Sequence, residues 1–162
     1  MGFEVAALAA ERWGLPRARK RYAGLYAEGR AGPGGPRVGV LLPQTFMNEA
    51  GRSAGPARGG LGVDLERVVA VHDEIDLPFG EVRVRRGGGL AGHNGLKSLK
   101  AALGGADFQR VRVGVGRPDS TEPEVVSAYV LGRFREPDDE VRALVERGAE
   151  ALERLLAAPP RE

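Results

Sequence analysis

The chain has 162 residues and a mass of 17.2 kDa, with 42% hydrophobic and 28% charged residues, which is the size and composition of one globular domain. It contains no run of about 18 apolar residues and no secretory signal pattern, so the sequence predicts no contact with a membrane. The chain has no cysteine, which excludes disulfides, thiolate zinc sites and cysteine nucleophiles and favours a cytoplasmic protein.

Helix and strand patterns alternate along the first half of the chain. The apolar residues of the first segment recur at helical spacing and stop at Gly14-Leu15-Pro16, which ends the helix. A glycine- and proline-rich turn at residues 29–36 separates two strand patterns. In chain order, the predicted elements are a helix at 3–13, strands at 21–28 and 37–42, a short helix after Thr45, and a buried strand at 67–71.

The second half continues the alternation. Val82 and Val84 alternate with charged residues, as in a half-buried strand, and a glycine cluster then leads into a helix through Leu96, Leu99 and Leu103. In chain order, the predicted elements are strands at 81–85 and 110–116 and helices at 124–131 and 137–157. Interleaved strands and helices predict a three-layer α/β sandwich, and no linker divides residues 1–162 into separate domains.

The charge is unevenly distributed along the chain. The net charge is +2, yet residues 81–117 carry eight basic side chains against only Glu81 and Asp107. A basic stretch in an otherwise acidic chain predicts a surface for polyanions. A solvated arginine face in a protein from a GC-rich genome is the alternative that charge alone leaves open.

The segment Gly51-Arg52-Ser53-Ala54-Gly55 matches the G-x-S-x-G pattern of α/β-hydrolases. Asp73 and His93 follow in the order that such a triad requires. A nucleophile elbow needs a buried strand directly before the serine, whereas the residues before Gly51 have a helical pattern. The sequence therefore argues against a serine nucleophile.

Residues 87–92, Gly-Gly-Gly-Leu-Ala-Gly, match the G-x-G-x-x-G pattern of a dinucleotide loop between a strand and a helix. The acidic residue expected about 20 positions later is missing, because Arg112 stands there within a predicted strand. The glycine loop alone is weak support for a nucleotide-binding oxidoreductase.

The predicted buried strand is followed by His72-Asp73-Glu74-Ile75-Asp76, at the end where open α/β sheets carry their chemistry. In an extended chain, Asp73 lies on the opposite face from His72 and Glu74. One carboxylate in a cleft can orient a histidine or hold a water molecule. Acidic residues that merely end a strand are the alternative, and the ligand spacing of a magnesium site is lacking.

Two asparagines stand where helices are predicted to begin. Asn94 follows His93 after the glycine cluster, where free N–H groups and the helix dipole favour an anionic ligand. An amide there can donate to a carbonyl or an oxyanion, or it can simply cap the helix. Asn48 leaves the same two possibilities open.

Several ordered blocks resemble the bacterial peptidyl-tRNA hydrolase family, and the resemblance covers nearly the whole chain. The blocks are residues 45–48, 71–78, 87–97, 108–118 and 130–132. The resemblance implies an α/β/α sandwich around a mixed twisted sheet that acts as a cofactor-free monomer. The family cleaves the ester between a peptide and the 3′-terminal ribose of tRNA, so the implied partner is peptidyl-tRNA, bound through its acceptor stem and peptide end.

The resemblance also implies residue roles. Asp73 matches the carboxylate that orients the family's catalytic histidine, Asn48 and Asn94 match amides that hold the ester and the attacking water, and His93 supports the cleft. Phe46, Met47 and Gly92 would contact the substrate beside them. The basic side chains on or near the tRNA path, some of them structural, would be Arg85, Lys97, Arg110 and Arg112.

The N-terminal end differs from the family pattern. The family begins with a strand, a Gly-Asn-Pro-Gly loop and an Arg-His-Asn motif, which directly precedes the segment that Met1-Gly2-Phe3 matches. The family's general-base histidine thus has no counterpart in these 162 residues, because His72 and His93 stand elsewhere. We expect a truncated or mis-started chain that is nearly inactive as it stands and lacks one strand of the sheet.

Three functions therefore compete at this point. Asp73, Asn48 and Asn94 favour a hydrolase acting on peptidyl-tRNA. The absent histidine favours a module of the same fold that binds structured RNA without cleaving it. A dinucleotide-binding oxidoreductase rests on the glycine loop alone.

Overall fold

The strands form two separate sheets among the residues that the computed structural model describes, which are 2–44, 49–87, 94–116 and 138–157. The first sheet is an antiparallel meander in the order β1-β2-β3, with β1 at Arg19–Arg21, β2 at Gly24–Arg30 and β3 at Arg37–Pro43. The second is mixed and has the order β4-β6-β5, with β4 at Val69–Glu74, β5 at Val82–Arg86 and β6 at Gln109–Gly114. Strand β6 is central, parallel to β4 and antiparallel to β5.

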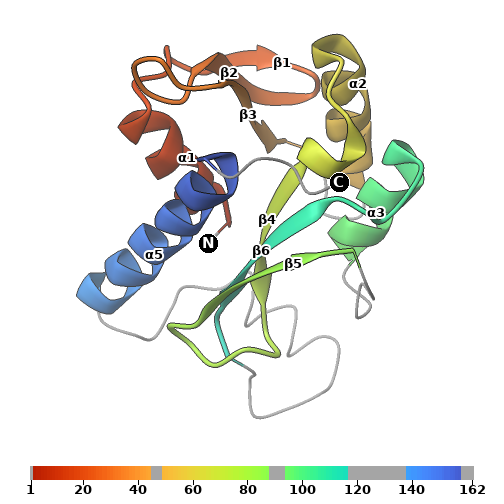
Figure 1. Ribbon diagram of the computed structural model, residues 1–162. Helices are drawn as coiled ribbons and strands as arrows, with labels where there is room; N and C mark the ends of the chain where they lie inside the picture. The colour runs from red at the N-terminus through yellow and green to blue at the C-terminus, as the bar shows by residue number, and fades with distance from the viewer. Residues whose placement is uncertain (1, 45–48, 88–93, 117–137, 158–162) are drawn as a thin grey trace.

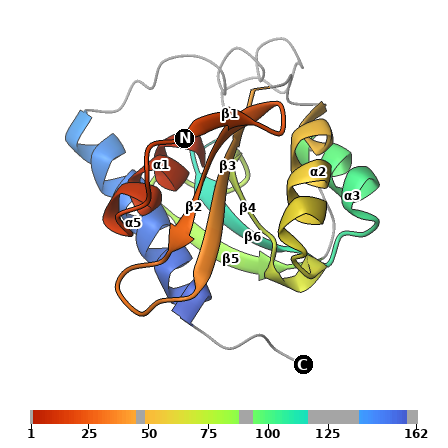
Figure 2. The same cartoon turned by 90° about the horizontal axis from the view of Figure 1, so that it is seen from above.

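Helices cover both faces of the mixed sheet, as Figures 1 and 2 show. One side carries α1 and α5, which lie next to each other, and the other side carries α2 and α3. Their bounds are Gly2–Arg12 for α1, Gly51–Leu61 for α2, Asn94–Leu103 for α3 and Asp138–Ala157 for α5, and a short 3₁₀ helix spans Leu65–Arg67. The predicted α/β fold with a mixed sheet is confirmed.

The alternation of side chains in β6 decides what each face of the mixed sheet contacts. Val111 and Val113 are fully buried against α1 and α5, in a cluster that includes Val5 and Leu144. Burial of such side chains stabilises the fold by about 1.5–3 kcal/mol each. The opposite face carries Arg110 and Arg112, so this face of the sheet is polar where α3 does not cover it.

The predicted strand at 21–28 is wrong in one respect, because the segment is a hairpin. β1 pairs with β2 across a tight turn at Tyr22 and Ala23, whose φ values are 57° and 53°. Two positive φ values suit a type I′ hairpin turn, in which asparagine and glycine are the usual residues. Tyr-Ala carries no such signal, so the turn could not be recognised from the sequence.

The described strands form two sheets, whereas we expected a single mixed sheet. Among the described residues, β3 forms no ladder with β4, and α1 packs against both strands. In place of the short helix expected after Thr45, the structure has the 11-residue helix α2, which begins at Gly51. The other predicted elements are confirmed to within a few residues, except that the predicted helix at 124–131 lies outside the described residues. None of the helices in the described ranges has the length and apolar character needed to cross a bilayer.

Candidate functional site

The end of β4 separates its three polar side chains as the sequence predicts. His72 and Glu74 are each 8% exposed and share the face of the sheet that carries Arg112, which is the register partner of His72. Asp73 points to the opposite face and is half-buried. The imidazole of His72 therefore does not face the carboxylate of Asp73, although its Nδ1 lies 3.0 Å from the backbone oxygen of that residue.

The Asp73 carboxylate lies at the N-terminus of α1. The backbone N–H of Gly2 donates to Asp73 Oδ1 over 3.1 Å. The helix can begin so close to β4 because residue 2 is glycine: a Cβ there would lie only 2.6 Å from the Val71 carbonyl oxygen. The helix dipole stabilises a negative charge at this point.

A mostly buried ion pair lies on the other face of β4. Arg112 Nε donates to Glu74 Oε1 over 3.0 Å, and the two side chains are 19% and 11% exposed. Such charge-assisted bonds are stronger than neutral ones. Glu74 thus holds a β6 arginine in place and compensates part of the positive charge on this face.

Arg110 is buried within the same face, with 3% exposure. Its Nη2 donates to the carbonyl oxygen of Gly87 over 3.2 Å. Burial lowers the pKa of the Arg110 guanidinium, and the nearby charges of Arg85 and Arg112 lower this pKa further. Arg110 therefore ties the end of β5 to the centre of the sheet rather than presenting its charge to solvent.

Arg85 and Lys97, by contrast, are exposed. Arg85 lies on edge strand β5 directly opposite Arg110, and Lys97 lies on α3. Of the four basic residues that the sequence indicated, these two present their charge on the surface.

The chain on both sides of residues 45–48 is held by hydrogen bonds. Before the segment, the N–H of Gln44 donates to the carbonyl of Ala23 in the β1–β2 turn over 3.0 Å. After it, the N–H of Gly51 donates to Ser98 Oγ in α3 over 2.9 Å. Helix α2 packs tightly here, since a Cβ on Gly51 would lie 2.5 Å from the Ser98 carbonyl oxygen.

Ser98 is a residue that sequence analysis missed. It fastens the start of α2 to α3, and no spacing in the sequence signals a contact between residues 47 positions apart. Asn94 is the first residue of α3, as predicted. The remaining predicted site residues lie outside the described residues: Phe46, Met47, Asn48, Gly92 and His93.

The structure rejects both competing motifs. Ser53 of the G-x-S-x-G match lies inside α2 and is fully buried, so it cannot act as a nucleophile. The glycine loop follows β5, an edge strand antiparallel to its neighbour, whereas a dinucleotide loop follows a strand of a parallel βαβ unit. Within the described ranges, no group of three or more histidine, aspartate or glutamate side chains could hold a metal ion.

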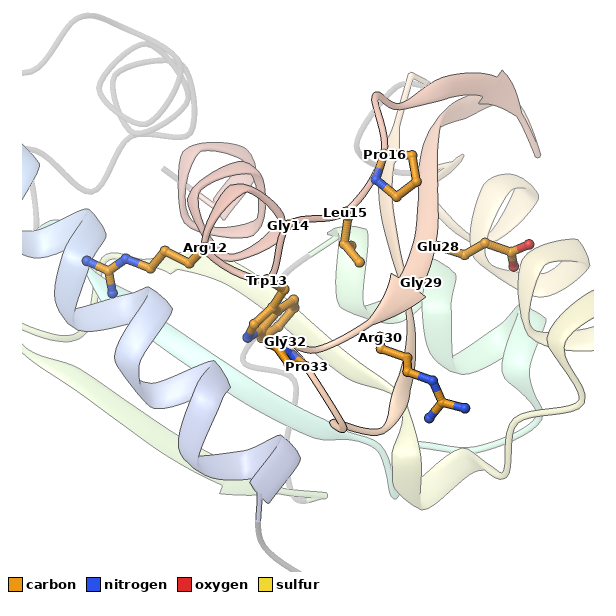
Figure 3. A pocket seen from close by; sticks show the side chains of 10 residues that line it. All are labelled: Arg12, Trp13, Gly14, Leu15, Pro16, Glu28, Gly29, Arg30, Gly32 and Pro33. Carbon is orange, nitrogen blue, oxygen red and sulfur yellow. The ribbon is translucent and has the colours of Figure 1, made fainter.

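A cavity of about 550 Å³ lies away from these residues, at the C-terminal end of α1 and the β2–β3 turn (Figure 3). Trp13, Pro16 and Pro33 line it together with Arg12 and Arg30. Asp73 is at the other end of α1, a helix of 11 residues or about 16 Å. The cavity is therefore not part of the Asp73 site.

Removal of Glu74 is expected to destabilise the fold by about 3 kcal/mol, because Glu74→Ala leaves Arg112 mostly buried beside Arg110 without its carboxylate. Urea unfolding would measure this as a lower midpoint at unchanged slope. Glu81→Ala is the matched control, since it breaks the exposed 3.3 Å pair with Arg83 and should cost less than about 1 kcal/mol. Equal losses of unfolding free energy in the two variants would show that the Glu74–Arg112 pair stabilises the fold no more than the exposed pair does.

Comparison with known proteins gives a consistent result. The family model described as peptidyl-tRNA hydrolase matches residues 1–161. The chain is 45% identical over 157 residues to the peptidyl-tRNA hydrolase of Syntrophotalea carbinolica, covering 96% of this chain and 80% of that protein. It is 40% identical over 160 residues to that of Halalkalibacterium halodurans, covering 98% and 84%.

Solved structures agree. A crystal structure of a peptidyl-tRNA hydrolase in complex with n-propanol superposes with a TM-score of 0.79 at 29% identity, covering 99% of this chain and 86% of that one. The peptidyl-tRNA hydrolase of Acinetobacter baumannii superposes with a TM-score of 0.77 at 28% identity, covering 98% and 86%.

Proposed function

The chain belongs to the peptidyl-tRNA hydrolase family, and from this premise we propose that it hydrolyses the ester bond between peptide and tRNA and so recycles tRNA from stalled or aborted translation. The observation that carries the proposal is the family match over residues 1–161. Identities of 40–45% over nearly the whole chain favour the hydrolase over a module that only binds RNA. Neither the glycine loop nor the fold supports a dinucleotide-binding oxidoreductase.

The Asp73 carboxylate is the group that we assign to orienting the general base. Its position at the start of α1 supports this, because a histidine ahead of the helix could donate an N–H to this carboxylate. An oriented imidazole takes a proton from the attacking water, and the nearby carboxylate stabilises the imidazolium that forms. The reaction needs no cofactor in this scheme.

The amides of Asn48 and Asn94 are proposed to hold the ester and the water, with His93 supporting the cleft and Phe46, Met47 and Gly92 contacting the substrate. The first turn of α3 suits such a role, since the helix dipole favours developing negative charge at its N-terminus. The bond between Gly51 and Ser98 supports the pairing of the two asparagines, because it ties the chain after Asn48 to the helix that Asn94 begins.

The acceptor stem of the tRNA is proposed to pass over the basic face of the mixed sheet. Exposed Arg85 and Lys97 are positioned to contact phosphates. Arg112, paired with Glu74, and buried Arg110 would shape this surface and add to its positive potential. We further propose that the protein acts as a monomer in the cytoplasm.

The function is tested by incubating the protein with an N-acetylated aminoacyl-tRNA and following release of deacylated tRNA. Because the general base is assigned to a histidine ahead of α1, the test uses both the 162-residue chain and a version joined to the N-terminal segment of a relative. Ester cleavage by the extended version supports the proposal. Tight tRNA binding without cleavage by either version would instead indicate an RNA-binding protein.

The double substitution Arg85→Ala/Lys97→Ala is expected to weaken tRNA binding. It should also flatten the slope of log affinity against log salt concentration by about two units, one for each phosphate that the protein no longer neutralises. Fluorescence anisotropy with deacylated tRNA at several salt concentrations would measure both quantities. Arg83→Ala is a suitable control, because Arg83 is also on β5 but pairs with Glu81. An unchanged slope in the double variant would remove these residues from the tRNA path.

A further inference from the structure

A second basic surface lies on the antiparallel sheet, apart from the basic stretch at residues 81–117. Residues 14–44 carry six basic side chains against the single carboxylate of Glu28. Four of the six gather in and just before β1, which is an edge strand. All four are exposed: Arg17, Arg19, Lys20 and Arg21. This excess of basic residues is visible in the sequence, but only when the charges of each segment are counted separately.

The charge of this strand is not compensated within the described part of the chain. There, no carboxylate forms an ion pair with any of the four basic residues. Glu28 is the nearest candidate in the sheet, and its Oε2 accepts instead from the hydroxyl of Tyr26 over 2.9 Å. Neighbouring like charges repel each other, so an anionic partner would stabilise this arrangement.

One of the four cations is held by aromatic rings. The guanidinium carbon of Arg21 lies 4.6 Å from the ring centre of Tyr22 and 5.9 Å from that of Tyr26. The two rings meet edge to face at 5.2 Å, which fixes the stack. A stacked guanidinium keeps its N–H groups available for phosphate while losing little freedom on binding. Arginines interleaved with aromatic rings are typical of surfaces that bind nucleic acid.

The strand ends beside the chain that leads into the proposed active site. The turn that follows Arg21 is bonded to Gln44, the residue directly before segment 45–48. From this turn, β1 leads outward along the edge of its sheet (Figures 1 and 2). Arg19 and Arg21 project to the same side about 6.6 Å apart, as residues two positions apart in a strand do.

We propose that β1, together with Arg17, binds the sugar–phosphate backbone of the tRNA substrate beyond its 3′-terminal ribose. This inference rests on the proposed function for the identity of the RNA. It adds a contact surface on the antiparallel sheet to the one assigned to Arg85 on β5 and Lys97 on α3. The turn after β1 is bonded to Gln44, and Lys97 lies on α3, the helix to which Gly51 is bonded.

The test is the binding of deacylated tRNA to the Arg19→Ala/Lys20→Ala variant. Removing two phosphate-binding charges should flatten the slope of log affinity against log salt concentration by about two units. The variant and the unaltered protein should then bind equally near 1 M salt, and the variant should bind roughly tenfold to hundredfold more weakly at 0.1 M salt. Arg21 is left in place because its stacking supports the turn. Arg19→Gln/Lys20→Gln, which keeps the side chains long, should give the same result if charge is responsible.

The matched control is Arg142→Ala/Arg154→Ala, which removes two exposed charges from α5. Its tRNA affinity should equal that of the unchanged protein. If the β1 and α5 double variants lost equal tRNA affinity, the effect would be one of net charge and the proposal would be overturned. An unchanged slope in the β1 variants, with thermal unfolding also unchanged, would overturn it as well.

A short substrate separates this inference from the proposed function. The β1 variant, carried in the extended chain, should hydrolyse a peptidyl ester of adenosine at the unaltered rate, because this substrate has no nucleotide beyond the terminal ribose. A lower rate would place β1 at the ester and contradict the proposal. If no version cleaved any ester while the salt slope still changed as expected, the proposed function would fail and the RNA-binding surface would stand.

Discussion

Asp73→Asn is expected to lower kcat for peptidyl-tRNA by about 10⁴-fold in a chain that carries the family's N-terminal segment. The amide has nearly the same shape as the carboxylate and can still accept the Gly2 N–H bond through its oxygen. Its NH₂ group, however, cannot accept a hydrogen bond from the N–H of the general base, and the neutral amide cannot stabilise an imidazolium. Replacing the carboxylate of a catalytic triad in this way has an effect of that size. Single-turnover hydrolysis with saturating enzyme would measure the chemical step.

Two comparisons make this result interpretable. Asp73→Asn should leave tRNA bound and should lower the free energy of unfolding by less than about 1 kcal/mol, because the amide keeps the packing and loses only the interaction of the charge with the α1 dipole. Asp76→Asn serves as the control, since Asp76 is exposed and lies beyond the end of β4. Near-full turnover by Asp73→Asn would show that Asp73 does not orient the base.

The second large effect concerns the base itself. A version joined to the N-terminal segment of the Syntrophotalea carbinolica relative, which is 45% identical, is expected to hydrolyse peptidyl-tRNA about 10²–10⁴ times faster than the 162-residue chain. The family resemblance assigns the general base to a histidine in that segment. The contact between Gly2 and Asp73 is consistent with this assignment, because it places the start of α1 beside the carboxylate.

The control is the same extended protein with the histidine of the added segment changed to alanine. It should hydrolyse peptidyl-tRNA as slowly as the unextended chain. Rates should be compared at equal concentrations of folded protein. Equal rates with and without the segment would assign the base to His72 or His93. For His72 this would require a rearrangement, because its ring is mostly buried on the face of β4 opposite to Asp73.

Local patterns in the sequence predict the placement of Asp73 and the start of α3. The two-residue period of a strand placed Asp73 opposite His72 and Glu74, and the structure confirms this. The glycine cluster before Asn94 predicted a helix beginning there, and α3 does. Local rules succeed at these points because the direction of a side chain in a strand and the start of a helix depend mainly on the neighbouring residues.

The β1–β2 turn shows where local rules fail. The segment around Tyr22 and Ala23 has the composition of a strand, yet both residues adopt positive φ. Pairing of β1 with β2 and the bond from Gln44 stabilise a turn that the residues themselves disfavour. The prediction of one continuous strand therefore missed the hairpin and, with it, the exposed basic edge.

The arginines illustrate what the sequence determined and what only the tertiary structure decided. Arg85 and Arg112 both alternate with valines, so the sequence determined that each lies in a strand and projects from its polar face. Arg85 is exposed because β5 is an edge strand, whereas Arg112 is mostly buried because β6 is central and Glu74 lies beside it. The partners of the site are 38, 47 and 71 residues apart in the chain. Such contacts depend on how whole elements pack, which no local pattern contains.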